Sequence, residues 1–438
     1  MGVVSKRGAF GLLAALLVVL LGIALAIGTG RGERVEVAAQ QPAPEVVPAA
    51  RGEWVGTWSA SPSGAEPGTR DGLGGQTIRN VVRTSVGGSG VRVELSNRYG
   101  SRPVTFTHVT VALPSALGGP TAHEGTMHRV TFGDGTAVTI PAGGSVLSDA
   151  VPLDLPPAAD LLVSLYTPDA TGPVTYHRMA QQPNYLARGD QSSQLSGAGF
   201  THAGDVWRYL TGVQVFTSAS DGAVVALGDS LTDGITSTPG ANRRWTDFLA
   251  ARLREEPDAP HMAVLNQGIS GNRLLRDGAP DRLFNGASGL SRLHSDVLHQ
   301  PGVSAVVVQL GVNDLLLEPR ASDARLIVHG LNQLAEESRA EGLRVLGATL
   351  APFGGHRGWT PELEQLRQQV NEQIRTAGIF DAVVDFDAAL HDPAAPHLML
   401  AAFDSGDGLH PNDHGFQAMA QAVDLTTLAD HDTSAQAL

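Results

Sequence analysis

The sequence predicts two folded regions, an all-β sandwich or jelly-roll domain followed by a three-layer α/β domain built on a parallel sheet. Three observations lead to this fold class. Short strand-like runs separated by glycine or proline fill residues 54–219, and buried-strand runs alternate with helical periods over residues 220–430. With 438 residues the chain is also too long for one ordinary core, and no internal repeat is evident.

An apolar run precedes both regions. Two basic residues are followed by an uncharged stretch over residues 9–27, which is just long enough to cross a hydrocarbon core of about 30 Å. Residues 1–30 are therefore predicted to be a signal peptide or a membrane anchor, and either one would export the remainder. Residues 31–53 form a proline-rich linker and residues 431–438 a tail. We expect an extracellular or cell-surface protein that touches a membrane only through this N-terminal segment.

Composition excludes several classes of function. The chain has 30 Lys and Arg against 44 Asp and Glu, and its net charge of −14 would repel a phosphate backbone, so nucleic acid is not an expected partner. It contains no cysteine. This rules out disulfides, thiolate metal sites, iron–sulfur clusters and a cysteine nucleophile. Serine, threonine, histidine and the carboxylates remain as reactive groups.

The N-terminal half shows alternating strand patterns and no long helical period. The runs Ile78 to Val86 and Val91 to Leu95 flank a glycine-rich turn and predict a β-hairpin. Further strand candidates follow at the spacing typical of a sandwich or jelly roll: Thr105 to Leu113, His128 to Phe132, Ala137 to Ile140, Asp160 to Tyr166, Val174 to His177 and Val206 to Phe216.

In the C-terminal half, strand candidates alternate with helical stripes. The strands are Ala223 to Leu227, Met262 to Leu265, Ser304 to Leu310, Arg344 to Leu350 and Ala382 to Asp385. Helical stripes are marked by Trp245, Phe248, Leu249 and Leu253, by Leu363, Leu366, Val370 and Ile374, and by Phe416, Met419 and Val423. Repeated strand–helix units predict a parallel sheet between helices, with reactive groups at the carboxyl ends of the strands.

Two segments at such strand ends carry groups suited to nucleophilic catalysis. Ser230 lies in the run Gly228 to Gly234, directly after the first strand, although a Gly-Asp-Ser turn is also common as a plain helix entry. A serine nucleophile needs a base, and Asp407 and His410 precede the last helix with two residues between them. A tight turn there can place the carboxylate against one imidazole nitrogen while the other faces the serine hydroxyl. We predict that Ser230, Asp407 and His410 are catalytic.

A second Asp-x-x-His pair, Asp296 and His299, competes with this assignment. It lies in a helical stretch before Pro301 and not in a loop that follows a strand. We therefore expect its two side chains to be solvated surface groups.

Two further strand ends offer hydrogen-bond donors for a developing oxyanion. The segment Asn266 to Asn272 exposes backbone N–H groups at its glycines, and Gly311 to Asp314 ends an apolar strand with the carboxamide of Asn313. Taken singly, each is also compatible with turn glycines and a helix cap. Asp229, Asp233 and Asp314 are expected to cap helices or support turns.

These four segments in this order, across roughly residues 221 to 428, resemble the SGNH-type GDSL hydrolase superfamily. The resemblance implies a flavodoxin-like fold with a five-stranded parallel sheet and no metal or organic cofactor. It also implies a role for each motif residue: Ser230 as nucleophile and first oxyanion donor, Gly271 as backbone donor with Gly268 as its rival, Asn313 as side-chain donor, and His410 as base oriented by Asp407. The β half, which starts near Trp54 and Trp58, is loosely similar to exported two-domain actinobacterial esterases of this type.

The expected function is that of an exported serine esterase that cleaves carboxylic esters through an acyl-enzyme on Ser230. Acetyl-glycan, short-chain and lipid esters all remain open as substrates, as does acyl transfer to an alcohol. One alternative is a metal-dependent hydrolase with Asp404, Asp407, His410 and His414 as ligands. Another is a glycan-binding cell-wall protein in which the β half makes the glycan contact and the hydrolase domain is degenerate.

Overall fold

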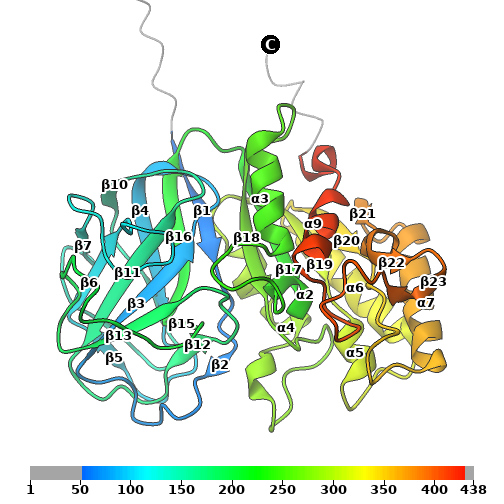
Figure 1. The fold of residues 1–438 in the computed structure, drawn as a ribbon, viewed down its shortest axis with the longest axis horizontal. Coiled ribbons are helices and arrows are strands. Elements are labelled where there is room, and N and C mark those ends of the chain that lie inside the picture. Colours follow the sequence, from blue (N-terminus) through cyan, green and yellow to red (C-terminus); the bar gives the residue numbers. More distant parts are fainter. Residues whose placement is uncertain (1–51, 430–438) are drawn as a thin grey trace, which may run out of the picture. The chain divides into compact units, whose positions relative to one another are not determined.

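The computed structural model describes residues 52–429, which belong to one compact unit (Figure 1). The predicted export segment at residues 1–30, nearly all of the linker and the tail lie outside the described residues. Within residues 52–429, no helix is both long and apolar enough to cross a membrane.

The first region consists mainly of two antiparallel sheets. One has the order β1-β16-β4-β10 with β9 also on β4: β1 (Glu53–Ser59), β16 (Leu210–Thr217), β4 (Gly88–Ser96), β10 (Val151–Leu155) and β9 (Ser145–Leu147). The other runs β14 (Thr201–His202), β13 (Asn184–Arg188), β3 (Gln76–Arg83), β11 (Asp160–Thr167), β6 (His108–Ala112) and β7 (His128–Val130). Apolar side chains from both sheets share one core, as predicted for a sandwich.

Shorter strands complete this region. They are β2 (Gly64–Ala65), β12 (Thr175–His177) and β15 (Trp207–Arg208) in a three-stranded sheet, and the pair β5 (Val104–Phe106) and β8 (Val138–Ile140).

The predicted hairpin between β3 and β4 is wrong. Strand β3 pairs with β11 and β13, whereas β4 pairs with β16, β10 and β9, so the two strands lie in opposite sheets. Both strands carry apolar side chains, and these pack face to face across the sandwich core. The turn that connects β3 to β4 packs closely on the end of β10. A glycine is needed there, because a Cβ at Gly87 would lie 2.4 Å from the Leu155 oxygen.

The second region has a five-stranded parallel sheet in the order β18-β17-β19-β20-β21, and each strand was predicted from the sequence. The strands are β18 (Met262–Gly268), β17 (Gly222–Gly228), β19 (Val303–Gln309), β20 (Arg344–Ala348) and β21 (Ala382–Val384). Of the helices, α3 (Trp245–Glu255), α7 (Pro361–Thr376) and α9 (Asp413–Gln421) match the predicted stripes, although Val423 lies beyond the end of α9. The remaining elements are α2 (Ser230–Asp233), α4 (Gly289–Leu293), α5 (Val312–Leu316), α6 (Ala324–Ala340), α8 (Phe386–Leu390), the helical turns η1 (Leu283–Asn285), η2 (His294–Leu298) and η3 (Leu425–Leu428), and the pair β22 (His391–Asp392) and β23 (Ala395–Met399).

Alternation along the strands separates the two helical layers. Val225 and Leu227 of β17 pack in a core with α6 and α7, whereas Val224 and Ala226 pack in a core with α3 and α9. The three-layer arrangement is thereby confirmed (Figure 1). Helix α6 was not predicted, although it buries a stripe of apolar side chains toward the sheet.

The two regions meet along their edge strands. Strand β1 ends one sheet of the sandwich and β18 ends the parallel sheet. Gly56 of β1 donates its N–H to the Pro301 carbonyl at 2.9 Å, and Val264 of β18 donates to Ser85 Oγ at 3.1 Å. Val55 of β1 packs into the core of the α/β region. Each sheet therefore covers an edge of the other that would otherwise be open to further strand pairing.

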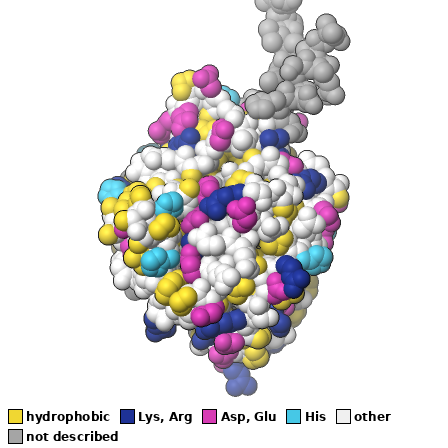
Figure 2. Space-filling view, turned by 90° about the vertical axis from the view of Figure 1, so that its right-hand side faces the viewer, with side chains coloured by type: hydrophobic (Ala, Val, Ile, Leu, Met, Phe, Trp, Pro, Cys, Tyr) yellow, Lys and Arg dark blue, Asp and Glu magenta, His cyan; other side chains and the backbone are white. Residues whose placement is uncertain are grey.

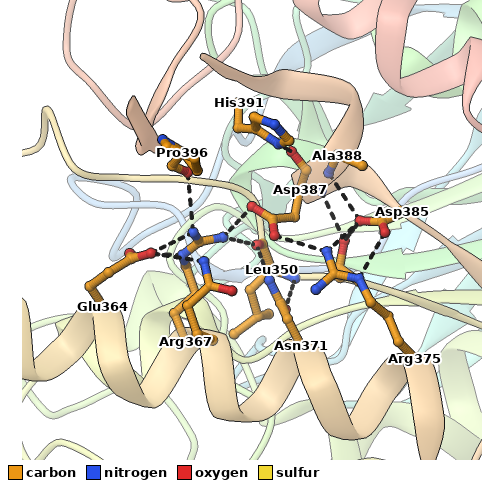
Figure 3. A network of polar contacts seen from close by, with 12 residues as sticks. Leu350, Glu364, Arg367, Asn371, Arg375, Asp385, Asp387, Ala388, His391 and Pro396 are labelled. Carbon is orange, nitrogen blue, oxygen red and sulfur yellow. Dashed lines mark hydrogen bonds and ion pairs between the residues drawn. The ribbon is translucent and has the colours of Figure 1, made fainter. Parts of the chain in front are cut away.

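A buried polar network fixes α7 to the end of β20 (Figure 3). The Arg367 guanidinium, with no exposed surface, donates to the Leu350 carbonyl at 2.8 Å and to Asp387 at 2.6 Å. It also binds Glu364, one turn earlier on α7. On the surface of this side of the molecule, basic and acidic side chains are intermixed (Figure 2).

Replacing Arg367 tests how much this network stabilises the fold. The substitution Arg367→Ala leaves the Asp387 carboxylate in the interior with one cation fewer, so we expect the free energy of unfolding to fall by roughly 3–5 kcal/mol. Urea denaturation measures the change. The control is Arg325→Ala, which removes an exposed ion pair with Asp323 and should leave the transition midpoint unchanged. Equal effects of the two substitutions would contradict the role of burial.

Candidate active site

Ser230 lies at the junction between β17 and α2. Asp229 caps α2, because its side chain accepts the N–H of Leu231 at 3.1 Å. The chain turns sharply here, and a Cβ at Gly228 would lie 2.1 Å from Thr232 Oγ1. Ser230 is buried, with 6% of its surface exposed. The turn thus presents the hydroxyl at the carboxyl edge of the sheet, where α/β folds place their reactive groups.

The structure brings His410 and Asp407 to this hydroxyl. His410 Nε2 lies 2.9 Å from Ser230 Oγ, and His410 Nδ1 lies 2.6 Å from Asp407 Oδ2. Because a carboxylate only accepts hydrogen bonds, Nδ1 carries the hydrogen and the lone pair of a neutral imidazole at Nε2 faces Ser230. The serine hydroxyl can therefore donate its proton to His410.

The environment of Asp407 keeps this side chain ionised. Burial raises its pKa, but hydrogen bonds from the His410 ring and from the backbone N–H groups of His410 and Leu409 outweigh burial and hold the pKa well below its usual range. A carboxylate is thus maintained against His410, where it fixes the tautomer and would stabilise an imidazolium.

The two candidate glycines in the loop after β18 have different surroundings. Gly268 donates its N–H to Asn266 Oδ1 at 2.9 Å, and a Cβ there would lie 2.2 Å from the Asp233 nitrogen, so this glycine allows close packing of β18 on α2. Gly271 adopts a left-handed conformation with φ of 80°. Its N–H has no acceptor among residues 52–429. This geometry favours Gly271 over Gly268 as a backbone donor.

Asn313 lies in α5, directly after β19, and only 6% of its surface is exposed. Its Nδ2 donates to the Asn272 carbonyl at 3.0 Å, which leaves the second hydrogen of the amide for another acceptor. The adjacent Asp314 accepts the N–H groups of Leu274 and Leu275 at 2.8 and 3.0 Å. Helix α5 therefore holds the loop that carries Gly271, and Asp314 supports a turn as expected.

Of the second Asp-x-x-His pair, His299 is exposed as expected, whereas Asp296 is not. Asp296 is 5% exposed and accepts a hydrogen bond from Arg292 Nη1 at 3.1 Å. The sequence did not identify Arg292, which is 1% exposed, although its i,i+4 spacing to Asp296 was a usable sign of an ion pair. Arg292 contacts the two strands that carry the site, because it donates to the carbonyls of Gly228 at 2.8 Å and Gln267 at 2.6 Å.

Three of the four candidate metal ligands, Asp404, Asp407 and His410, have other partners. The Asp404 carboxylate accepts the N–H groups of Gly406 and Gly408 at 2.8 and 3.1 Å, and Asp407 pairs with His410. Over residues 52–429, no three His, Asp or Glu side chains are grouped so that they could hold a metal ion. The arrangement gives the metal-dependent alternative no support.

A three-layer α/β fold with a serine, a histidine and an aspartate in hydrogen-bonded series defines the class of serine hydrolases. Residues 226–418 match the model of the GDSL-like lipase/acylhydrolase family. This region therefore belongs to that family within the SGNH/GDSL hydrolase superfamily, and the protein is a serine hydrolase of ester bonds. No curated protein matches the chain.

Several solved structures are similar to part of the chain. A GDSL-like lipase from Bacteroides thetaiotaomicron is 19% identical and covers 47% of this chain and 88% of its own, with a TM-score of 0.35. Est24, a carbohydrate acetylesterase from Sinorhizobium meliloti, is 18% identical over 46% of this chain and 95% of its own, with a TM-score of 0.35. A member of the lipolytic protein G-D-S-L family from Veillonella parvula is 18% identical over 46% and 94%, with a TM-score of 0.33.

Asp229 combines its capping role with an unusual charge state. Its Oδ2 is buried and has no hydrogen-bond partner in the described part of the chain. Burial raises the pKa of this carboxyl to about 7, against a weaker lowering by the N–H of Leu231. Below that pH the folded protein holds a neutral acid beneath Ser230, whereas an unfolded chain releases this proton near pH 4.

The substitution Asp229→Asn tests this buried acid. Between about pH 4 and pH 7 the unfolded wild type ionises while the folded state keeps the proton, so wild-type stability falls as pH rises and is constant above pH 7. Asparagine also caps helices but carries no charge. We expect Asp229→Asn to gain stability relative to wild type as pH rises from 4 to 8, by up to about 4 kcal/mol. Denaturation at several pH values measures this, and a pH-independent difference would contradict it.

Proposed function

We propose that the protein is an exported serine esterase that hydrolyses carboxylic esters through an acyl-enzyme on Ser230. The observation that carries this proposal is the position of the His410 ring, which joins the hydroxyl of Ser230 at 2.9 Å to the carboxylate of Asp407 at 2.6 Å. This series supplies a base and an orienting acid to an otherwise weak nucleophile.

In the proposed mechanism Ser230 Oγ attacks the ester carbonyl and its proton passes to His410 Nε2. The imidazolium, paired with Asp407, then protonates the departing alcohol and leaves an acyl group on Ser230. Water enters, gives a proton to His410 and attacks the acyl-enzyme, and the same proton returns to Ser230 as the carboxylic acid is released.

Three donors suit the oxyanion formed in each half of this reaction. They are the N–H of Ser230 in the first turn of α2, the N–H of Gly271 and the free Nδ2 hydrogen of Asn313. Preorganised donors of this kind stabilise charge that develops only in the transition state. Two of these donors are held close together, because Asn313 in α5 donates to the carbonyl of Asn272, the residue after Gly271.

Export rests on the N-terminal sequence alone. The apolar run at residues 9–27 precedes the folded region and is flanked by basic residues. Expression with and without residues 1–30, followed by fractionation of the culture into medium, membrane and interior, tests this part of the proposal. Equal retention of both forms in the interior would contradict it.

The glycan-binding alternative depends on exposed aromatic rings in the β region. Trp58 is 4% exposed and packs edge-on against Trp207 with ring centroids 4.8 Å apart. The ring of Trp54 contacts that of Phe216 at a tilt of 55° and lies under the guanidinium of Arg92. These rings serve packing, which favours the esterase over a binding module.

Replacing Ser230 tests the function directly. We expect Ser230→Ala to lower kcat for aryl esters by at least about 10³-fold while the circular dichroism spectrum is unchanged, because the nucleophile is lost. A series of aryl esters of rising acyl length, together with an acetylated polysaccharide, defines the substrate class. Ser193→Ala, on the exposed surface, is the matched control. An organophosphonate should inactivate the wild type and a chelator should not; the reverse result would favour a metal-dependent hydrolase.

A second prediction concerns the backbone donor at Gly271. An added Cβ would be strained at φ of 80° and would lie 2.6 Å from Asn285 Oδ1, so the turn must shift. We expect Gly271→Ala to lower kcat at least about tenfold with a smaller change in KM, because the donor acts on the transition state. Gly378 also has positive φ but no neighbour within 4 Å, and Gly378→Ala should leave kcat unchanged. An unchanged kcat in Gly271→Ala would remove this residue from the oxyanion site.

A further inference from the structure

A buried pair of side chains links the β region to the helix that carries Ser230. His177, at the end of β12, places Nε2 at 2.9 Å from Asp233 Oδ1 on α2. The two side chains are 4% and 3% exposed. No local pattern marks this pair, since the residues lie 56 positions apart.

Both nitrogens of the His177 ring face acceptors. Nδ1 lies 2.8 Å from the Ser61 carbonyl oxygen, which can only accept, and Nε2 faces the Asp233 carboxylate. A neutral ring would therefore leave one nitrogen without a hydrogen to donate. Burial lowers the pKa of His177, but the charge and hydrogen bond of Asp233 outweigh it and raise the pKa above the ordinary value. A protonated ring can donate to both acceptors, so this arrangement favours protonation of His177.

The second oxygen of Asp233 holds the loop after β18. Asp233 Oδ2 accepts the backbone N–H of Ser270 at 2.8 Å and the Ser270 hydroxyl at 2.6 Å. Ser270 precedes Gly271, and the peptide bond between them carries the Gly271 N–H. Two hydrogen bonds to one carboxylate oxygen therefore restrict the residue that sets the direction of this N–H.

Neighbouring contacts hold His177 in place from the β region. The Trp207 ring packs against the imidazole with centroids 5.3 Å apart. Ser61, whose carbonyl receives the Nδ1 hydrogen, is itself bound through its hydroxyl by Arg292 at 3.0 Å. Arg178, the next residue, lies over the ring of Phe284 in η1, 4.2 Å from its centroid. Residues of the β region are thus packed next to the segment that holds the Gly271 loop.

We propose that His177 is a positioning residue for ester hydrolysis, through which the β region orients the Gly271 N–H by way of Asp233 and Ser270. This proposal rests on the proposed function, because it assumes that Gly271 donates to an oxyanion. It assigns the β region a part in the reaction that differs from glycan binding.

The test compares two substitutions of His177 in the full chain. His177→Ala removes both ring donors, and we expect kcat for an aryl acetate to fall about 10- to 100-fold with KM changed less than about twofold, because the oxyanion site acts in the transition state. His177→Gln keeps an N–H near the position of Nε2 and should recover at least about fivefold over alanine. His202→Ala removes an exposed histidine that also pairs with an aspartate, Asp205, at 2.9 Å, and it should leave kcat unchanged.

Two further measurements separate positioning from simple loss of folded protein. Titration of active sites with an organophosphonate gives kcat per functional molecule, which a purely structural role would not lower. The affinity for phenylboronic acid, which forms a tetrahedral adduct on a serine, should fall in parallel with kcat/KM across the His177 variants. If His177→Ala does not fold, His177→Gln and Ser270→Ala carry the same comparison.

The outcomes distinguish this proposal from the proposed function. Unchanged kcat per active site in His177→Ala, or boronate affinity that stays constant while kcat falls, would overturn the positioning role and leave the esterase assignment intact. Wild-type activity in Ser230→Ala would instead overturn the proposed function, whatever the His177 variants show.

Discussion

The site depends on the buried guanidinium of Arg292. The carboxyl ends of the parallel strands present backbone carbonyl groups at one edge of the sheet. Arg292 donates to two of them, Gly228 on β17 and Gln267 on β18. It also donates to Asn272 Oδ1 at 3.1 Å and is neutralised by Asp296. A planar group with five donors can join these acceptors at once, which a lysine cannot do. These bonds, together with the pairing of β17 and β18, tie the Ser230 turn to the Gly271 loop.

The same guanidinium extends the site into the β region, since it also binds Ser61 Oγ. Edge strands β1 and β18 protect each other, and Val55 of the β region packs into the core of the α/β region. The secondary structure changes between β16 and β17, close to the boundary that the sequence predicts, yet the packing continues across it. An interface that is buried and joined by ion pairs resembles a domain interior more than a contact between independent modules.

The features that the sequence predicted have local patterns, whereas most of those it missed depend on contacts between residues far apart in the chain. The five parallel strands, the three helical stripes and the four motif segments were predicted because each has a local pattern of apolar spacing or turn residues. The predicted hairpin was wrong because β3 pairs with β11 and β4 pairs with β16, both of which are distant in the sequence. The strands β3 and β4 therefore pack face to face and do not pair with each other. His177 was missed for the same reason, since Asp233 lies 56 positions away. The contact of Arg292 with Ser61 spans 231 positions, although its ion pair with Asp296 is local. A lone histidine in a strand carries no mark of such a contact.

The carboxyl groups around Ser230 differ in how many hydrogen bonds they accept. Three hydrogen bonds meet each of the carboxylates of Asp407 and Asp233. Those on Asp407 hold its pKa well below the usual range. Asp229 receives only the Leu231 N–H, and burial raises its pKa to about 7. In the proposed mechanism an oxyanion forms beside the α2 turn, where an ionised Asp229 would oppose it by direct repulsion. Asp229 caps the helix that carries the nucleophile, and it avoids this repulsion where it remains neutral, in mild acid. The negative charge that stabilises the imidazolium of His410 lies instead on Asp407, on the far side of the ring.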